Sequence, residues 1–178
     1  MSPRWGSLSK PPAEVLERAA LPPGEKVLAS GDASDGSWLL GTRRLLVMIT
    51  HDERVLMPWE QVEDVSWDHE GERLRITGIG EYGQPRPSYT FVMAEPAHLL
   101  QLVRERVTAS IVLQRRVPVR GRLGLQVIGR RSPVGGPITW MHAYDAGLNP
   151  DDPEVVAVAD LALLQAQAEV GETPSNSI

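Results

Sequence analysis

The sequence predicts an α+β protein that is mostly β, with a small antiparallel barrel capped by one amphipathic helix. Three observations predict this fold class. Seven short runs of strand character follow one another between residues 25 and 93, and short strands at such spacing are typical of barrels and sandwiches. One amphipathic helical pattern comes directly after them. A further β-hairpin and a C-terminal helix follow from residue 109 onward.

The segment before the first strand, residues 1–24, is expected to form a tail and one short helix. Two prolines open a helical pattern that runs from Ala13 to Ala20, because proline is tolerated in the first turn of a helix. The sequence Leu-Pro-Pro-Gly at residues 21–24 ends this helix, since proline and glycine interrupt regular structure.

The barrel strands are expected where apolar residues alternate or run together between turn sequences. The clearest alternation places Val65 and Trp67 on one face and acidic or small polar residues on the other, which is typical of a half-buried strand. The segment Gly31–Gly36 is rich in turn-forming residues. The strands are expected at residues 25–29, 38–41, 45–49, 54–57, 62–68, 73–77 and 88–93.

A capping helix is expected from Ala97 to about Thr108, directly after a Glu-Pro pair. Its apolar residues form one stripe, so the helix has one side that faces a core. This side is expected to plug the open end of the preceding sheet, which completes a barrel over residues 25–108. The stripe consists of Leu99, Leu100, Leu102, Val103 and Val107.

The next segment, residues 109–170, is expected to form a β-hairpin and a C-terminal helix that pack on the barrel. Pro118 should keep the first hairpin strand at a sheet edge, because proline cannot donate to the ladder. Asp152 is the expected N-cap of the helix, with Pro153 in its first position. The strands are expected at residues 110–119, 123–130 and 138–144, and residues 171–178 are expected to be a disordered tail.

The composition is that of an ordinary globular protein, with 178 residues of which 42% are hydrophobic and 23% charged. The chain has no cysteine, so it can form neither a disulfide framework nor a thiolate metal site. No apolar run is long enough to span a membrane, and residues 1–6 lack the apolar core of a secretory signal. We therefore expect a cytoplasmic protein without a cofactor.

The net charge of −5 hides a strong asymmetry along the chain. Residues 104–131 contain eight arginines and one acid, whereas residues 145–172 contain seven acids and no base. One interpretation is that the two segments face each other and neutralise locally. The other is that the arginines form a surface for a partner or for nucleic acid. The first interpretation is favoured.

The arginine-rich hairpin is the candidate binding site that the sequence offers. A non-catalytic interaction with a protein partner is the function we expect, through this hairpin or an edge of the barrel. Nucleic-acid binding through the same arginines is the alternative, although no aromatic residue alternates with them for base stacking. The candidate residues are Arg115, Arg116, Arg120, Arg122, Arg130 and Arg131.

Catalytic and metal-binding motifs are not evident, so the chain is not expected to be an enzyme. Asp68, Glu70 and Glu72 around His69 are read as a solvated turn between two strands. There is no nucleophile elbow and no phosphate-binding glycine loop. An enzyme whose site assembles only in space is the weaker alternative. The four histidines, at 51, 69, 98 and 142, are scattered, and the tryptophans at 38, 59, 67 and 140 are expected in the core.

The most distinctive stretch joins two apolar strands through a Thr-Arg-Arg bend and continues into Met-Pro-Trp-Glu-Gln-Val. Its residues are Gly41–Val47 and Met57–Val62, and the pattern continues through Val65, Trp67, Leu74–Ile76 and the helix Leu99–Val107. With this order of strands and a helix, residues 25–108 resemble bacterial pleckstrin-homology-like (PH-like) domains. The resemblance implies a barrel that binds a protein or a peptide and, in some members, a lipid headgroup.

Phosphoinositide binding is not expected in spite of this resemblance. The lipid-binding members use lysine and arginine in the loop between the first two strands, because anionic headgroups need fixed cations. In this chain the corresponding loop, Gly31–Gly36, holds two aspartates and no base. The resemblance therefore points to a protein or peptide as the partner.

Overall fold

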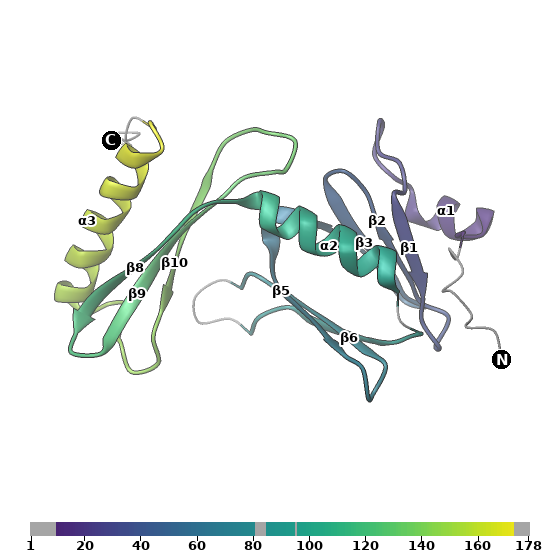
Figure 1. Cartoon of the computed structure of the whole chain (residues 1–178), viewed down its shortest axis with the longest axis horizontal. Helices are drawn as coiled ribbons and strands as arrows, with labels where there is room; N and C mark the ends of the chain where they lie inside the picture. The colour runs from purple at the N-terminus through teal and green to yellow at the C-terminus, as the bar shows by residue number, and fades with distance from the viewer. Residues whose placement is uncertain (1–9, 81–84, 95, 173–178) are drawn as a thin grey trace. The chain divides into compact units, whose positions relative to one another are not determined.

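The computed structural model describes residues 10–80, 85–94 and 96–172. These residues form an α+β protein that is mostly β, with three antiparallel sheets and three α-helices (Figure 1). The fold class is thus confirmed, but the described strands stay in separate sheets and do not form one closed barrel. The chain divides into two compact units, Met1–Ser110 with Ser132–Val134 and Ile111–Arg131 with Gly135–Ile178, called here the N-terminal and C-terminal units.

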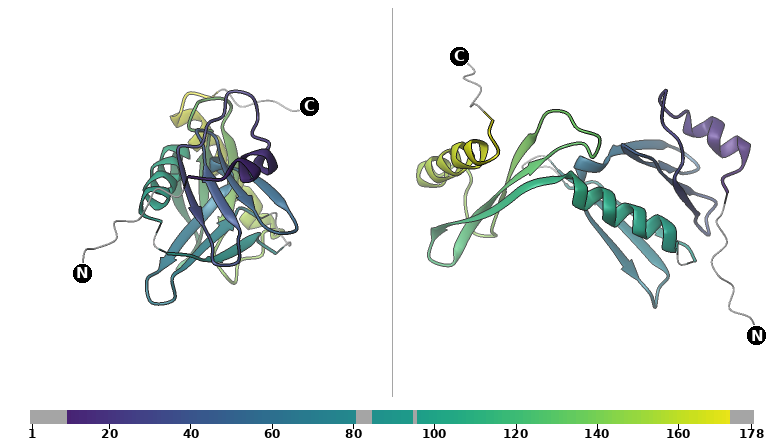
Figure 2. Two further views of the ribbon diagram at one scale, coloured as in Figure 1. Left: turned by 90° about the vertical axis from the view of Figure 1, so that its right-hand side faces the viewer. Right: turned by 45° about the horizontal axis from the view of Figure 1, so that its top comes forward.

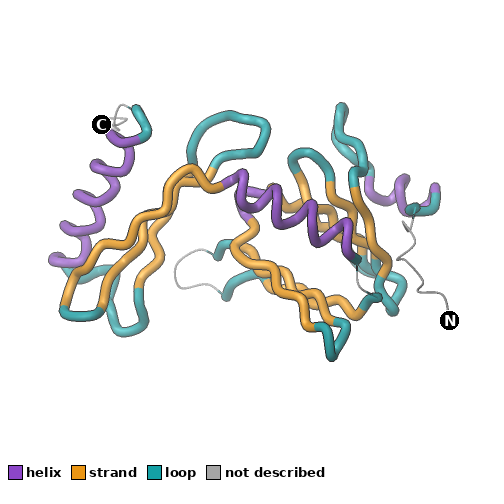
Figure 3. Tube along the Cα trace, viewed as in Figure 1, coloured by secondary structure: helices purple, strands orange, loops and turns teal. Residues whose placement is uncertain are grey.

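The N-terminal unit contains two sheets, whose strands are coloured orange in Figure 3. The first sheet has the order β1-β2-β3-β4 and the second the order β5-β6-β7. The strands are β1 (Ala29–Asp32), β2 (Trp38–Gly41), β3 (Leu45–Ile49), β4 (Arg54–Pro58), β5 (Val62–Asp68), β6 (Arg73–Gly78) and β7 (Ser88–Val92). The helices are α1 (Ala13–Ala19), the 3₁₀ helix η1 (Trp59–Gln61) and α2 (Ala97–Ser110).

The first sheet is covered on both faces, because successive side chains of a strand point to opposite sides. Leu39 of β2 and Met48 of β3 join the main core with the apolar side of α2. Leu40 and Val47, one residue along, pack instead with the buried residues of α1. The two further views in Figure 2 show α2 beside the strands of this unit, and it contacts β1, β2, β5 and η1. The predicted core-facing side of α2 is confirmed.

The first strand differs from the sequence prediction, since it occupies residues 29–32 instead of 25–29. The reason is that the turn after β1 is shorter than the segment Gly31–Gly36 that was expected to form it. The Ala33 N–H donates to the Ser37 carbonyl at 2.8 Å, and the Asp35 carboxylate accepts the Ser37 N–H at 2.9 Å. Gly36 takes a φ of 84°, which glycine adopts without strain. The residues before this turn therefore remain in the strand.

The C-terminal unit is a three-stranded sheet of order β10-β9-β8 with one helix on it (Figure 1). Its elements are β8 (Ile111–Arg120), β9 (Leu123–Arg130), β10 (Thr139–Tyr144) and α3 (Pro153–Glu169). Pro118 lies in the edge strand β8, as predicted. The predicted cap of α3 is also confirmed, because the Asp152 side chain accepts the Glu154 N–H at 3.0 Å. Packing of this unit on a barrel remains a prediction.

The ends of the chain are described only in part. Gly171 and Glu172 follow α3, and the Glu172 carboxylate accepts the indole N–H of Trp140 at 2.8 Å. The remainder of the predicted tail, residues 173–178, and the N-terminal residues 1–9 with Trp5 lie outside the described residues. Within the described part of the chain, no helix combines the length and apolar character needed to cross a membrane.

Candidate functional site

Three of the six candidate arginines pair with carboxylates of their own unit. The Arg116 guanidinium contacts both oxygens of Asp145, at 3.1 and 2.5 Å. Arg120 contacts Asp152 at 3.2 Å and also pairs with Glu154. Arg115 pairs with Glu169 near the end of α3. Local neutralisation, the favoured interpretation of the charge asymmetry, is confirmed for these three side chains.

Two of the carboxylates in these pairs, Asp145 and Asp152, stay ionised to lower pH than usual, because each has a lowered pKa. The hydrogen bond from Arg116 is the main cause that lowers the pKa of Asp145, and the Gly124 N–H adds to it at 2.8 Å. The Glu154 N–H is the main cause that lowers the pKa of Asp152, and the hydrogen bond from Arg120 comes second. Each arginine thus has a compensating negative charge.

The other three candidate arginines do not converge on one surface. Arg122 is exposed in the hairpin turn and Arg131 is exposed just beyond the other end of β9. Nine residues of extended chain place them about 30 Å apart. Arg130 has only 6% of its surface exposed, so it offers little charge to a ligand. The six arginines that lie close together in the sequence are therefore either paired with carboxylates or separated from one another in the structure.

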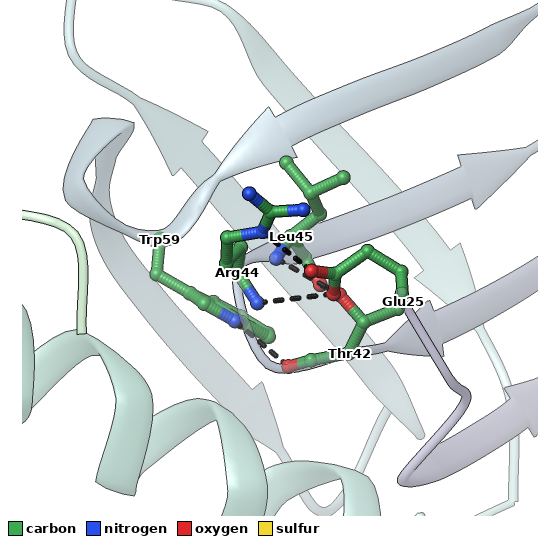
Figure 4. Close-up of polar contacts among 5 residues, drawn as sticks. All are labelled: Glu25, Thr42, Arg44, Leu45 and Trp59. Carbon is green, nitrogen blue, oxygen red and sulfur yellow. Dashed lines mark hydrogen bonds and ion pairs between the residues drawn. The ribbon is translucent and has the colours of Figure 1, made fainter. Parts of the chain in front are cut away.

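The Thr-Arg-Arg bend between β2 and β3, which is the most distinctive part of the sequence, is occupied by internal contacts (Figure 4). The Trp59 indole N–H donates to the Thr42 carbonyl at 3.1 Å in a buried position. The Thr42 hydroxyl accepts the Leu45 N–H at 3.0 Å and closes the turn. Arg44 donates its Nε–H to Glu25 at 2.5 Å. These residues hold the first sheet to η1 and leave the bend with a structural role.

Glu25 is the acid that completes this network. Its side chain is 2% exposed while that of Arg44 is 47% exposed. Burial alone would raise the pKa of Glu25, but hydrogen bonds from Thr42 and Arg44, together with the charge of Arg44, outweigh burial and lower the pKa below 4.5. The residue was expected to begin a strand, and its pairing with Arg44, 19 residues away in the sequence, is a finding of the structure.

Replacing Glu25 with glutamine is expected to lower the free energy of unfolding by about 1–3 kcal/mol at pH 7, because hydrogen bonds to a charged group are lost. Since the folded pKa is depressed, the carboxylate stabilises the fold above its unfolded pKa, and this stabilisation disappears as the pH falls through the folded pKa. Urea unfolding at pH 7 and at successively lower pH values checks this. The difference between wild type and variant should shrink below about pH 4.5, and a constant difference would contradict it.

A groove of about 480 Å³ lies in the N-terminal unit between α1 and the segment that leads into β1. One wall is the continuous segment Lys26–Ser30, and Leu16 and Leu21 come from the other side. Leu16 and Leu28 are 39% and 48% exposed, which is high for leucine. The floor is continuous with the core around α1, because Leu21 and Val27 pack against it. The groove is therefore a mainly apolar site that is open to solvent.

The charges at this groove are only positive. Lys10 and Lys26 line it, and they are the only two lysines of the chain. No acidic side chain is among the lining residues. On the other side of Leu28, a smaller hollow of about 210 Å³ extends to α2. The sequence analysis missed the groove, whose only signal in the sequence was Lys26 directly before the apolar pair Val27-Leu28.

The strand beside the groove lies at the edge of its sheet. β1 is at one end of the order β1-β2-β3-β4, and within the described residues β2 is its only strand partner. An end strand carries backbone N–H and C=O groups that can pair with another extended chain. The groove thus combines a backbone edge, apolar walls and two cations.

The remaining sequence candidates have no arrangement that suggests chemistry. His51, His69 and His98 are exposed, and the described residues contain no group of His, Asp and Glu suited to a metal ion. In the β1–β2 turn the N–H of Ser37 lowers the pKa of Asp35, so a carboxylate stays where a phosphate would have to bind. Trp59 is fully buried, as expected, whereas Trp38, Trp67 and Trp140 are half-buried.

Comparison of the chain with family models, with curated proteins and with solved structures found no match.

Proposed function

We propose that the chain is a non-catalytic binding module whose N-terminal unit holds an extended, acidic segment of a protein partner along β1. The observation that carries this proposal is the groove beside β1, where the only two lysines of the chain flank exposed leucines. An extended segment gains affinity from main-chain hydrogen bonds at a strand edge and specificity from pockets for alternate side chains. The groove and the smaller hollow share Leu28 and Ala29 in their linings, so two hollows meet at the start of β1.

The order of elements supports the same function. Seven strands followed by α2 make up the N-terminal unit, which is the order that the resemblance to PH-like domains implies. That resemblance also implies binding of a protein or a peptide. The acidic β1–β2 turn argues against a phosphorylated headgroup at that turn, because carboxylates repel phosphate.

The arginine hairpin is the less favoured location for a partner. Arg115, Arg116 and Arg120 already have carboxylate partners, so binding there would have to displace them. Nucleic-acid affinity depends on cations that can neutralise phosphates, and these three are compensated. Among the described residues neither Lys10 nor Lys26 has an ion pair, so a protein segment with carboxylates can pair with both lysines at the groove.

Binding of fluorescent peptides tests the proposal. A peptide that alternates apolar residues with glutamate should raise the fluorescence anisotropy on addition of the protein, and the same peptide with lysine in place of glutamate should not. The double variant Lys10→Glu/Lys26→Glu should weaken binding about tenfold or more, since two attractions become repulsions and tenfold corresponds to about 1.4 kcal/mol.

The matched control is Arg122→Glu/Arg131→Glu, which reverses two exposed charges of the C-terminal unit that are not among the residues lining the groove. It should bind the acidic peptide as wild type does. Arg115 and Arg116 are unsuitable controls, because a glutamate there would face Glu169 or Asp145. Equal loss of binding in both double variants, or no binding of the acidic peptide to wild type, would overturn the proposal.

A further inference from the structure

A hollow of about 410 Å³ lies between β5 and α2 within the N-terminal unit, and we call it the β5 hollow. Its volume falls within the range of about 300–1,000 Å³ that is typical of small-molecule sites. It is distinct from the groove beside β1, because the two have no lining residue in common. The lining consists of Trp67 and His69 on the side of β5, and of Ala97, Leu100, Gln101, Arg104 and Glu105 on the side of α2.

The aromatic side of the β5 hollow is fixed by its own hydrogen bond. The Trp67 indole N–H donates to His69 Nδ1 at 3.1 Å, and the two rings meet edge to face with their centroids 6.0 Å apart. Trp67 also packs partly against the main core. Because its single donor is already used, Trp67 offers the hollow an apolar aromatic surface. His69 accepts at Nδ1, so its neutral imidazole carries the proton on Nε2 and can donate it to a ligand.

Helix α2 supplies an apolar residue and a cation to the same hollow. Leu100 is 7% exposed and is the buried residue of the lining. Arg104 follows Leu100 by four residues, so it lies on the same side of α2 one turn further on. Arg104 is exposed, and in the described part of the chain its guanidinium has no ion pair. The guanidinium is therefore available to an anion.

The acids near the β5 hollow are already engaged or lie on the opposite side. The Glu105 carboxylate accepts a side-chain N–H of Gln101 at 3.0 Å. Asp68 follows Trp67 in β5 and thus points to the other side of the strand, where its carboxylate accepts the Glu70 N–H at 3.1 Å. The hollow therefore combines an aromatic surface, a buried leucine and one arginine without an ion pair.

We propose that the β5 hollow binds a small aromatic carboxylate, with the ring against Trp67 and the carboxylate on Arg104. A planar guanidinium can hold a carboxylate through two parallel hydrogen bonds. Two aromatic rings in contact gain more than the burial of their area alone. His69 Nε2 is a second donor to the ligand. Each group that lines the hollow through Trp67, His69 and Arg104 thus has a counterpart in this class of molecule.

The charges at the β5 hollow select this class over two others. A cationic ligand could stack on Trp67, but Arg104 would repel it and Glu105 already accepts a hydrogen bond. A phosphate group carries up to two negative charges at neutral pH, whereas Arg104 is the only arginine or lysine of the lining. A single carboxylate matches a single guanidinium. This inference does not depend on the function proposed for the groove beside β1.

Titration of the full chain with 2-naphthoate, followed by heteronuclear NMR, tests the proposal. The indole N–H resonance of Trp67, identified by its loss in Trp67→Phe, should shift in a saturable way. The neutral 2-naphthamide has the same ring and should bind about tenfold more weakly, because a hydrogen bond to a charged group is lost. Decahydro-2-naphthoate keeps the charge without the aromatic ring and should bind about fivefold more weakly.

Two substitutions on α2 test the role of charge. Arg104→Gln should weaken binding of 2-naphthoate about tenfold and remove the preference for the acid over the amide. Glu105→Gln should bind 2-naphthoate at least as tightly as wild type, because a repulsion is removed while the new amide oxygen can still accept from Gln101. The control Arg43→Gln replaces an exposed arginine of the same unit that does not line the hollow, and it should bind as wild type does.

The variant Lys10→Glu/Lys26→Glu separates this site from the groove beside β1. It should lose the acidic peptide but keep the shift of the Trp67 resonance with 2-naphthoate. All the replaced charges are exposed, and unchanged circular dichroism spectra would show that the variants fold. The proposal would be overturned by a Trp67 resonance that does not shift, by equal affinity for the acid and the amide, or by full binding in Arg104→Gln. Weaker binding in Glu105→Gln than in wild type would also overturn it.

Discussion

Replacing Trp59 with alanine is expected to destabilise the N-terminal unit by about 3–5 kcal/mol, the usual cost of removing a buried tryptophan side chain. Trp59 has no exposed surface and belongs to the main core. Its backbone N–H donates to Arg44 and its indole N–H to Thr42, both at 3.1 Å. Total stabilities of domains are about 5–15 kcal/mol, so this loss should leave much of the unit unfolded near its usual working temperature.

Phenylalanine at the same position separates packing from hydrogen bonding. Trp59→Phe keeps most of the apolar volume but leaves the buried Thr42 carbonyl without its indole partner, which is expected to cost about 1–3 kcal/mol. The matched control is Trp67→Phe, because the Trp67 indole donates at 3.1 Å to His69 in an exposed position. Urea unfolding curves measure both variants. Equal losses of unfolding free energy at the two positions would show that the buried hydrogen bond to Thr42 stabilises the fold no more than the exposed one to His69.

Replacing Gly124 with alanine is expected to destabilise the C-terminal unit by about 1–3 kcal/mol or more, the range for overpacking a closely packed site. A Cβ on Gly124 would lie 2.5 Å from the Val117 carbonyl oxygen and 3.4 Å from the Cα of Pro118. These are backbone atoms of the paired strand β8, so they cannot rotate away. The strands would have to separate where Gly124 also donates its N–H to Asp145.

Gly121 in the same hairpin supplies the comparison. It has a φ of +58° and open space where a Cβ would lie, so Gly121→Ala should cost only the left-handed backbone conformation, about 1–2 kcal/mol. Gly121→Asn should cost less, because asparagine tolerates this conformation. Thermal unfolding of the three variants gives the order. A Gly124→Ala variant as stable as Gly121→Asn would contradict the close approach of β8 and β9.

Most elements of the fold could be predicted because their signals are local. The Asp-Pro pair at 152 and 153 marked the start of α3, and the apolar spacing of α2 marked its buried side. The division of the N-terminal unit into two sheets could not be predicted, since the chain passes from one sheet to the other through η1, a helix of only three residues after Pro58. The start of β1 was also not predictable from its own sequence. Glu25, which was expected to begin the strand, pairs with Arg44 in the bend between β2 and β3.

The candidate sites were predictable to a smaller extent. Opposite charges in two segments predicted the pairs of Arg115, Arg116 and Arg120, but the partner of each depends on how the hairpin folds against α3 and against the turn after β10. The groove beside β1 was missed because its walls come from α1 and from residues that had been placed inside a strand. A pocket assembled from separate segments leaves no motif in the sequence.

The location of the two lysines has a practical consequence for any assay of this protein. Apart from the α-amino group, their side chains supply all the primary amines of the chain, and both line the groove beside β1. Amine-reactive dyes and biosensor surfaces that couple through amines would therefore modify the groove itself. A ligand of the groove would then escape detection on such a surface. Because the chain has no cysteine, one introduced on the C-terminal unit, for example at the exposed Arg122, would give a single attachment point that is not among the residues lining the groove.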